Sequence, residues 1–379
     1  MIKKIPFNKP FRTGQEIKYI QKSIGNGHIS GRGPFTKKAE NLLKKQLLIS
    51  NDILLTTSCT HALEISSILM NFKPGDEVIV PSFTFVTTAL AFYMHGAKII
   101  LADIREDTLN IDENKIEKLI SKKTKCIVVV HYAGVGCEMN SIMKIAKKYN
   151  LVVIEDNAHG LYAKYNNQLL GTIGHLATLS FHETKNIICG EGGAIIINNK
   201  NYSKRAGRIL EKGTDRIEFI KGKVKKYSWV DKGSSYILSD ILAAFLYAQL
   251  EQSKTIINKR KYIWEFYNKN LTDWAYNNNV SLPFVPKHCE HSYHMYYIIM
   301  PNNKTRNTFI KYLANYNIQS IFHYSPLHLS KMIMKKNMKK YYCPVSKKIS
   351  DRIIRLPFFC EITNKELNYI INKIKNFKN

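Results

Sequence analysis

One lysine stands where a reactive amine could be held. Lys185 follows the strand-like run Ala177–Phe181 and precedes the glycine-rich turn Gly190–Gly193, after which a second strand-like run, Ala194–Asn198, begins. A lysine attacks a carbonyl only as the neutral amine, which a tight and partly desolvated loop favours. The pattern makes Lys185 a candidate nucleophile, although a solvated lysine before a glycine turn has the same local sequence.

A carboxylate and a hydroxyl upstream of this lysine sharpen the prediction. The apolar run Leu151–Ile154 is typical of a buried strand, and Asp156 lies at its C-terminal end. Open α/β sheets place ligand-binding groups at such strand ends. Pyridoxal phosphate (PLP) needs an anion at its ring nitrogen, an amine for its aldehyde and donors for its phosphate. Asp156, Lys185 and the intervening Ser180 match these three needs.

The motifs around these residues resemble those of the DegT/StrS family of nucleotide-sugar aminotransferases, which are PLP enzymes of aspartate-aminotransferase-like fold. The resemblance extends from about Pro6 to Leu356-Pro357. It implies a type I PLP fold, with Lys185 as the catalytic lysine that carries the cofactor and Asp156 as the catalytic partner of the ring nitrogen. The shared stretches include Val130–Val135, Phe181–Asn186, Glu211–Thr214 and Gly233–Tyr236.

Other cofactor positions follow from the same resemblance. Cys59 and Thr60 precede the helix-like run Ala62–Met70, so they could form a phosphate-binding helix N-terminus or an ordinary cap. The resemblance assigns both to the cofactor phosphate, with Cys59 acting through its backbone. It also implies that Phe85 stacks on the pyridine ring, for which a core phenylalanine is the alternative. His159 is expected beside the ring and its phenolic oxygen.

Two further segments are assigned by resemblance alone. Ser235 stands where many family members carry an asparagine that reaches the other subunit's phosphate, which implies a homodimer with shared active sites. Serine donates one hydrogen bond but reaches less far. His323, Tyr324 and His328 fall in a family motif near the mouth of the active site and are candidate substrate residues; a packed turn is the alternative.

The elements that must position these residues alternate between strand-like and helix-like runs with short links. This alternation predicts an α/β fold with a mixed, mostly parallel sheet between helices. We expect a large PLP-binding domain over residues 1–250 and a small C-terminal α+β domain over residues 251–379. The strand-like runs are Ile53–Thr56, Val78–Pro81, Lys98–Asp103 and Lys125–His131, and in the small domain Tyr296–Met300 and Ile318–Phe322; one helix-like run, Ala243–Tyr267, leads out of the large domain.

The bulk composition limits the other classes of protein. The 379 residues are 45% hydrophobic, which favours a folded chain with more than one core. Residues 1–6 are charged without an apolar run behind them, so we expect no signal peptide, and the uncharged run Val78–Ala97 is broken by Pro81 and Gly96, so we expect no membrane span. Seven cysteines without a C-x-x-C pair indicate free thiols in a reducing compartment, and therefore a cytoplasmic protein.

The formal net charge is +28, from 57 Lys and Arg against 29 Asp and Glu. Such an excess is also typical of proteins that bind nucleic acid or membrane surfaces. The lysines are spread along the chain without a recognition motif, so we expect no nucleic-acid partner; a positive field would also attract a dianionic sugar nucleotide. We expect no metal, because H-E-x-x-H is absent and His291 with His294 lacks a further set of ligands.

Within the family, the similarity is greatest to the branch that moves an amino group from L-glutamate to C4 of dTDP-4-keto-6-deoxyglucose, giving dTDP-4-amino-4,6-dideoxygalactose. That branch supplies polysaccharides such as lipopolysaccharide and enterobacterial common antigen. Amination at C3, or of a UDP- or GDP-keto sugar, uses the same cofactor motifs and remains open. A branch that makes 3-deoxysugars carries histidine in place of the lysine, so Lys185 counts against it. The stretches 131–135, 211–214 and 227–236 are candidates for anchoring the substrate, with shared packing as the alternative.

Overall fold

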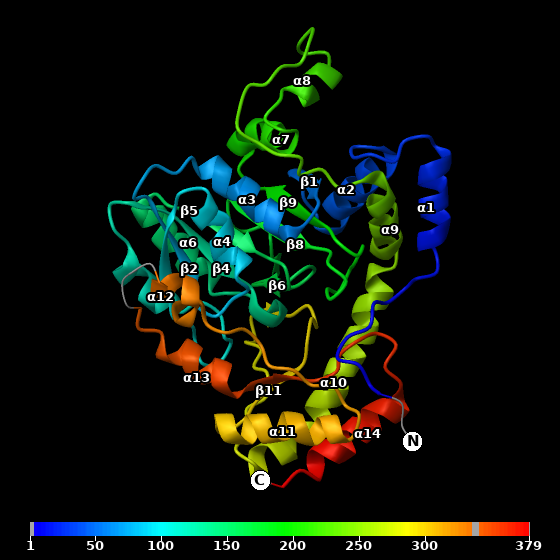
Figure 1. Ribbon diagram of the computed structural model, residues 1–379, viewed down its shortest axis with the longest axis vertical. Coiled ribbons are helices and arrows are strands. Elements are labelled where there is room, and N and C mark those ends of the chain that lie inside the picture. The colour runs from blue at the N-terminus through cyan, green and yellow to red at the C-terminus, as the bar shows by residue number, and fades with distance from the viewer. Residues whose placement is uncertain (1–3, 336–340, 379) are drawn as a thin grey trace.

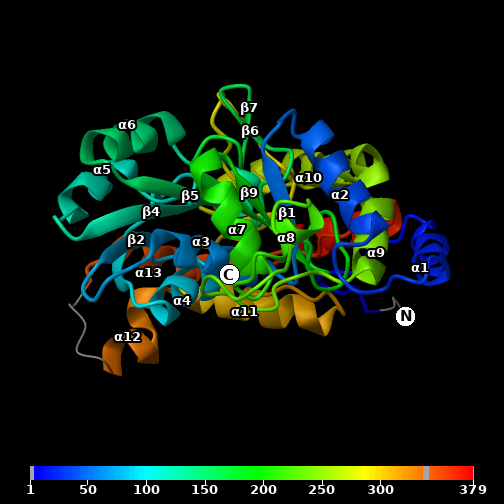
Figure 2. The same cartoon turned by 90° about the horizontal axis from the view of Figure 1, so that it is seen from above.

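A computed structural model describes residues 4–335 and 341–378 (Figures 1 and 2). Its centre is a seven-stranded sheet formed by these residues. In spatial order the strands are β1 (Asp52–Thr56), β9 (Gly193–Ile197), β8 (Leu176–Ser180), β5 (Val152–Asp156), β4 (Thr124–Val130), β2 (Glu77–Pro81) and β3 (Lys98–Ala102). Apolar, largely β-branched segments such as β4 and β5 suit strands that are buried on both faces.

One strand of this sheet runs against all the others. β9 is antiparallel to both of its neighbours, β1 and β8, whereas β8, β5, β4, β2 and β3 are mutually parallel. The sheet is therefore mixed and mostly parallel, as predicted. Because β9 runs the opposite way, its first residue, Gly193, pairs with the last residues of β1 and β8, Thr56 and Ser180. Asp156 ends β5 at the same edge of the sheet.

Side-chain alternation along the strands separates the two faces of the sheet. On β4, Cys126 and Val128 belong to a core shared with α3 (Cys59–Met70) and α4 (Thr87–Met94). Ile127 and Val129 belong to the opposite core, which contains α6 (Met139–Tyr149). Figure 2 shows α3 and α4 on one side of these strands and α6 on the other. The same alternation on β5 directs the adjacent residues Glu155 and Asp156 to opposite faces.

The remaining helices complete these layers and form a projecting segment. α2 and α9 pack together beside β1, α7 packs on α3, and α8 with its flanking loops projects beyond α7 at the top of Figure 1. Their bounds, with those of α1 and α5, are α1 (Glu16–Gly25), α2 (Pro34–Gln46), α5 (Glu113–Ile116), α7 (Ser203–Leu210), α8 (Arg216–Ile220) and α9 (Asp240–Glu251). Three short strands form a second sheet: β6 (Lys164–Tyr165), β7 (Gln168–Leu169) and β10 (Cys289–Glu290).

The C-terminal part has a separate hydrophobic core, which includes Tyr267, Tyr296, Phe309 and, from the other end of the chain, Ile5. It lies at the lower end of the molecule in Figure 1. Its elements are α10 (Ser253–Asn277), β11 (Tyr297–Ile299), α11 (Asn303–Asn315), α12 (Lys331–Lys335), α13 (Pro344–Arg352), β12 (Ile353–Arg355) and α14 (Asn364–Lys375). The domain boundary at residues 250/251 falls between α9 and α10 and stays a prediction.

Two expectations about this part were wrong in detail. The helix-like run 243–267 is two helices, because α9 ends at Glu251 and α10 begins at Ser253. The backbone leaves helical geometry at Gln252, whose N–H bonds to the carbonyl of Gln249 and ends α9. Within α10, Ile256 packs with the core that contains α9, whereas Ile263 packs with the C-terminal core, so α10 connects the two parts. The run 318–322 makes isolated bridges to Ile5 and Arg355 instead of a strand ladder.

Candidate active site

Asp156 is a buried carboxylate at the end of β5, on the face that carries α3 and α4. Its Oδ2 accepts a hydrogen bond from Thr88 Oγ1 at 2.7 Å, and its Oδ1 accepts one from the backbone N–H of Ala158 at 3.3 Å. Burial raises the pKa of Asp156, while the Thr88 hydroxyl and the positive charge of Lys185 act in the opposite direction. The carboxylate therefore has few protein donors and favours a positive group beside it.

Lys185 lies in the tight loop between β8 and β9. Backbone hydrogen bonds hold this loop: Phe181 N–H donates to Gly192, Cys189 N–H donates to Phe181, and Lys185 N–H donates to the carbonyl of His182. Burial lowers the pKa of Lys185 to about 8, although the Asp156 carboxylate raises it. An appreciable fraction of this amine is therefore neutral near neutral pH, which is the form that attacks carbonyls. The desolvated loop predicted for Lys185 is present.

The N-terminus of α3 lies at the same edge of the sheet. Ser58 Oγ accepts from the backbone N–H of His61 at 3.1 Å, while the N–H groups of Cys59 and Thr60 belong to the first turn and have no partner inside the helix. A side-chain carbon on Gly193 would approach the backbone nitrogen of Cys59 to 2.4 Å, so glycine is required for this close approach of β9 and α3. The Cys59 thiol contacts Thr178 Oγ1 at 3.4 Å, and burial raises its pKa. It is not a reactive thiolate.

Four aromatic side chains surround the ring of His159. The imidazole of His294 stacks on it at 4.3 Å between centroids, and Tyr324 OH lies 3.5 Å from its Nε2. Tyr132 OH is hydrogen-bonded to Nδ1 of His323 at 2.6 Å, and both rings contact His159. Burial, reinforced by the charges of Lys185 and Arg355, lowers the pKa of His159 well below its ordinary value. These histidines are neutral, and His159 Nδ1 is buried with no partner among the described residues.

The structure brings Phe85 and Ser180 to this site and leaves Ser235 and His328 apart from it. Phe85 is exposed, with its ring 6.1 Å from that of Tyr324, and Ser180 is half-buried beside Gly193. Ser235 is exposed on the segment next to α7, where it bridges to Glu211. His328 binds Ser82 through Nδ1 at 2.7 Å and makes no ring contact with the His159 cluster within the described ranges. Its assignment to the substrate stays a prediction.

Sequence reasoning missed several residues of the site. Thr88 bonds directly to Asp156, and His294 was weighed only as a metal ligand. Asn186, next to Lys185, donates from Nδ2 to the Ser292 carbonyl at 2.7 Å and contacts His294 Nδ1 through its Oδ1 at 2.9 Å. Arg355 carries a positive charge close enough to lower the pKa of Lys185. Thr88 lies three residues after the predicted cofactor residue Phe85, and this spacing could have indicated that it belongs to the site. No such local signal exists for residues 294 and 355, because tertiary packing brings them to the site.

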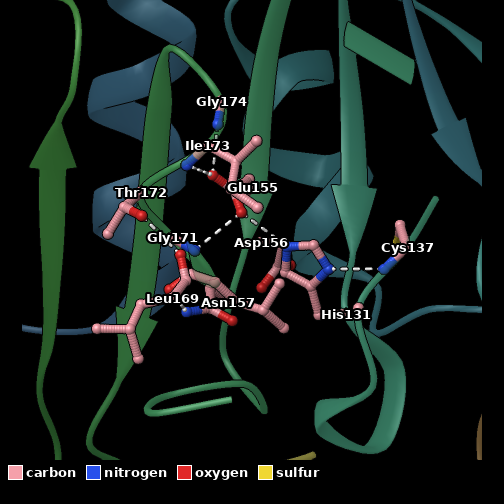
Figure 3. Close-up of polar contacts among 12 residues, drawn as sticks. His131, Cys137, Glu155, Asp156, Asn157, Leu169, Gly171, Thr172, Ile173 and Gly174 are labelled. Atoms are coloured by element: carbon pink, nitrogen blue, oxygen red, sulfur yellow. Dashed lines mark hydrogen bonds and ion pairs between the residues drawn. The ribbon is translucent and has the colours of Figure 1, made fainter. Parts of the chain in front are cut away.

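Glu155, on the opposite face of β5, belongs to a structural network (Figure 3). Its carboxylate accepts backbone N–H bonds from Gly171, Ile173 and Gly174 at 2.6–2.9 Å and contacts His131 Nε2 at 2.9 Å. These hydrogen bonds lower its pKa against the effect of burial. His131 is itself fully buried and accepts from Cys137 N–H through Nδ1. For this residue, shared packing explains the family similarity better than a substrate contact does.

The residues present fit PLP at four points. Asp156 offers a carboxylate to a protonated ring nitrogen, and the first turn of α3 offers free N–H groups to a phosphate, as helix N-termini do. The Nδ1 of His159, which is buried and has no partner over residues 4–335 and 341–378, can offer a hydrogen bond to a polar substituent of the ring. Lys185 lies within electrostatic range of Asp156 and supplies the amine. These features fit a PLP enzyme of the aminotransferase class.

Comparisons with known proteins agree. The model of the DegT/DnrJ/EryC1/StrS aminotransferase family matches residues 11–375. GDP-perosamine synthase of Escherichia coli O157:H7 is 31% identical over 99% of each chain, and the uncharacterized protein MJ1066 of Methanocaldococcus jannaschii is 33% identical over 97% of each. The solved structure of Spr1654 from Streptococcus pneumoniae, described as a sugar aminotransferase, superposes with a TM-score of 0.90 at 26% identity over 98% of both chains in its pyridoxamine phosphate (PMP) form.

The fold and the site thus define a PLP-dependent sugar aminotransferase of fold type I. The chain belongs to the DegT/DnrJ/EryC1/StrS aminotransferase family. The predicted fold class, cofactor and enzyme class are confirmed. Within the described residues no helix is long and apolar enough to cross a bilayer, and no cluster of three or more potential metal ligands occurs.

Proposed function

We propose that this enzyme transfers the amino group of L-glutamate to the keto group of a nucleotide-activated sugar. The observation that carries the proposal is the placement of Lys185, with its lowered pKa, beside Asp156 and at the sheet edge that holds the N-terminus of α3. PLP, when bound, supplies an electron sink that stabilises a carbanion next to the nitrogen. The chain's own residues must hold that cofactor and move protons.

Each residue then has a distinct role. Asp156 would hold the protonated ring nitrogen, because its buried carboxylate is stabilised by a positive partner. Lys185 would hold the cofactor through its amine and would move a proton at the reacting carbon, for which its pKa of about 8 suits neutral conditions. Neutral His159 can donate a hydrogen bond without adding a positive charge near Lys185.

The lysine assignment has a direct test. Purified enzyme loaded with PLP should be yellow, and reduction with borohydride should fix the cofactor to the peptide that contains Lys185. The peptide that contains Thr184-Lys185-Asn186 should appear modified in the peptide map, while the peptide that contains Lys212 serves as an internal control. Label on any lysine other than Lys185 would contradict the assignment.

We propose dTDP-4-keto-6-deoxyglucose as the acceptor, aminated at C4 to give the axial amine of the galacto product. The support is local resemblance outside the cofactor motifs, because the chemistry at Lys185 is the same at C3 and C4. A second candidate is a GDP-keto sugar, since the 31% identical relative is named as a GDP-perosamine synthase. Incubation with glutamate and several nucleotide keto sugars, followed by NMR, distinguishes them. Nitrogen at C3, a large H3–H4 coupling, or exclusive use of a GDP sugar would overturn the dTDP assignment.

We also propose a cytoplasmic homodimer in which Ser235 contributes to the partner's site. Ser235 is exposed on the segment next to α7, so its side chain is accessible to a second copy. Mixing a Lys185→Ala subunit with a Ser235→Ala subunit should restore activity, because half of the sites in each hybrid then carry neither lesion. A fully active monomer, or a mixture no more active than its two parents, would contradict the sharing.

A further inference from the structure

The imidazole of His294 covers one face of the His159 ring. The two rings are nearly parallel, with an angle of 17° between their planes and 4.3 Å between their centroids. His294 lies between β10 and β11, whereas His159 follows β5, so this contact joins the C-terminal part to the large sheet. Nδ1 of His159 is buried without a partner in the described ranges, and a buried polar atom of this kind lowers stability unless a ligand satisfies it.

Asn186, the residue after Lys185, determines which nitrogen of His294 carries the proton. Its Nδ2 donates to the Ser292 carbonyl at 2.7 Å, and its Oδ1 contacts Nδ1 of His294 at 2.9 Å. The reverse orientation of this amide would set its oxygen against the Ser292 carbonyl oxygen, and neither atom can donate. Because an amide oxygen only accepts, Nδ1 of His294 must be the donor. Burial, reinforced by nearby positive charges, lowers the pKa of His294 well below its ordinary value, so the ring is the neutral Nδ1–H tautomer.

The backbone that carries His294 is fixed by side chains from other elements. Arg260, a buried residue of α10, donates from Nε to the Tyr293 carbonyl at 3.0 Å and from Nη2 to the His294 carbonyl. Ser292 Oγ donates to the carbonyl of His159. Tyr293 has a φ of 53°, a left-handed conformation that is uncommon for an aromatic residue. Such a conformation persists only where the surroundings over-determine it, and these hydrogen bonds do so.

We propose that His294 positions the ring of His159 for the cofactor and that Asn186 orients His294. This inference rests on the proposed function, in which His159 meets a polar substituent of the PLP ring. The hydrogen bond from Nδ1 stops the His294 ring from turning about its side-chain bonds, so its face stays parallel to His159. His159 then cannot turn its Nδ1 away from the cofactor without breaking the stacked contact. Because Asn186 follows Lys185, one side chain also ties the lysine loop to this pair of rings.

The test measures the affinity of the apoenzyme for PLP, which does not depend on turnover. His294→Phe keeps a flat ring that can stack on His159 but has no donor for Asn186. Its dissociation constant for PLP should rise about tenfold, as for the loss of one hydrogen bond. Asn186→Ala should have at least this effect, and the double variant should bind PLP no more weakly than Asn186→Ala alone, because both changes remove the same hydrogen bond.

A second cycle asks whether the effect passes through His159. In a His159→Ala background, His294→Phe should change PLP affinity by less than about twofold. The absorbance spectrum of PLP-saturated His294→Phe should also differ from that of the wild type, which a loss of stability alone would not produce. His291→Phe is the matched control: it makes the same change three residues earlier, where the ring contacts Trp264 and Tyr293, and should leave both affinity and spectrum unchanged.

Unchanged PLP affinity in His294→Phe would show that stacking alone is required and would overturn the proposal. A loss that persists in full in the His159→Ala background would also overturn it, because the substitution would then act through the lysine loop or the fold. If His294→Phe fails to fold, Asn186→Ala carries the same cycle with His159→Ala. A His159→Ala apoenzyme with wild-type affinity would contradict both this inference and the proposed role of His159, and a wild-type apoenzyme that binds no PLP would contradict the proposed function itself.

Discussion

Glu155 and Asp156 are adjacent carboxylates on one strand, but their hydrogen-bond environments differ. Glu155 faces α6 and is saturated by three backbone N–H groups and His131. Asp156 faces α3 and α4 and, in the part of the chain that the structure describes, has one hydroxyl donor, Thr88, and one long backbone contact. Hydrogen bonds lower the pKa of the first residue, whereas burial raises that of the second. A carboxylate whose acceptor sites are filled by the protein stabilises structure; one that is left with open sites can bind a ligand.

The two faces of β5 therefore have different roles: the Glu155 face contributes to stability, and the Asp156 face is proposed to contribute to the chemistry of the site. The Glu155 side fixes the loop over residues 171–174, which precedes β8 and so helps to set the position of the strand that ends before Lys185. The Asp156 side supplies the negative charge that raises the pKa of this lysine and that we propose for the cofactor ring nitrogen. Substitutions on the two faces should consequently affect different measurements.

The largest expected effect is the loss of turnover in Asp156→Asn. The amide keeps the shape and can still contact Thr88, but it cannot stabilise a protonated ring nitrogen, so turnover should fall by about a hundredfold or more, roughly 2.7 kcal/mol of barrier. Steady-state kinetics of the PLP-saturated variant measure this, and its thermal melting should change little. Near-normal turnover would remove Asp156 from the mechanism.

Glu155→Gln should show the reverse pattern. Loss of the charge that four donors share should destabilise the fold by about 2–4 kcal/mol, while turnover of the folded variant stays within about threefold of the wild type. Chemical denaturation with parallel kinetics tests this. Glu117→Gln is the control, because that carboxylate bonds to Lys148 and Tyr149 on the surface and its loss should not alter stability measurably.

The pH dependence of stability should distinguish the Glu155 variant as well. The folded-state pKa of Glu155 is lower than the ordinary value of 4.5, so its stabilisation is present above that value and is lost as the pH falls through the folded-state pKa. The stability difference between wild type and Glu155→Gln should therefore shrink on acidification below about pH 4.5. A difference that is constant down to acid unfolding would show that charge is not the cause.

A smaller effect is expected on cofactor uptake. Because the pKa of Lys185 is about 8, the rate at which apoenzyme takes up PLP covalently should rise about tenfold per pH unit below that value and level off above it. Removing the negative charge in Asp156→Asn should move this midpoint to lower pH, and Glu155→Gln should leave it in place. Stopped-flow absorbance between pH 6 and 9 provides the measurement, and an unshifted midpoint in Asp156→Asn would contradict the coupling.

The smallest change is expected for Thr88→Val, which removes the one side-chain donor that Asp156 has among the described residues and keeps the side-chain volume. A hydrogen bond of this kind is worth about 1 kcal/mol, so turnover should fall about fivefold, most strongly at acid pH because the Thr88 bond lowers the pKa of Asp156. Thr84→Val, which loses a hydroxyl bonded to Thr88 but not to Asp156, should have a lesser effect. Equal losses in the two variants would show that helix packing, not the carboxylate contact, is being measured.

Much of the fold could be predicted because its signals are local. Apolar β-branched runs gave the strands of the large sheet to within a residue or two, and their short links predicted the mostly parallel order. The break at Gln252 was missed because residues on both sides of it have helical propensity, and a single residue that leaves helical geometry has no signature in the hydrophobic pattern. The isolated bridges of residues 318–322 depend on the N-terminal segment and β12, which are distant in sequence.

For the site, the sequence by itself predicted the roles of Lys185 and Asp156, because strand ends, glycine turns and family motifs lie close along the chain, and these roles stay predictions. Tertiary structure decided which of two neighbouring carboxylates is open, since pleating sends Glu155 to the donors of residues 171–174 and Asp156 to Thr88. It also brought His294 and Arg355 to Lys185 from more than a hundred residues away. Burial and the sum of nearby charges set the pKa of a side chain, and both are properties of packing that no local spacing encodes.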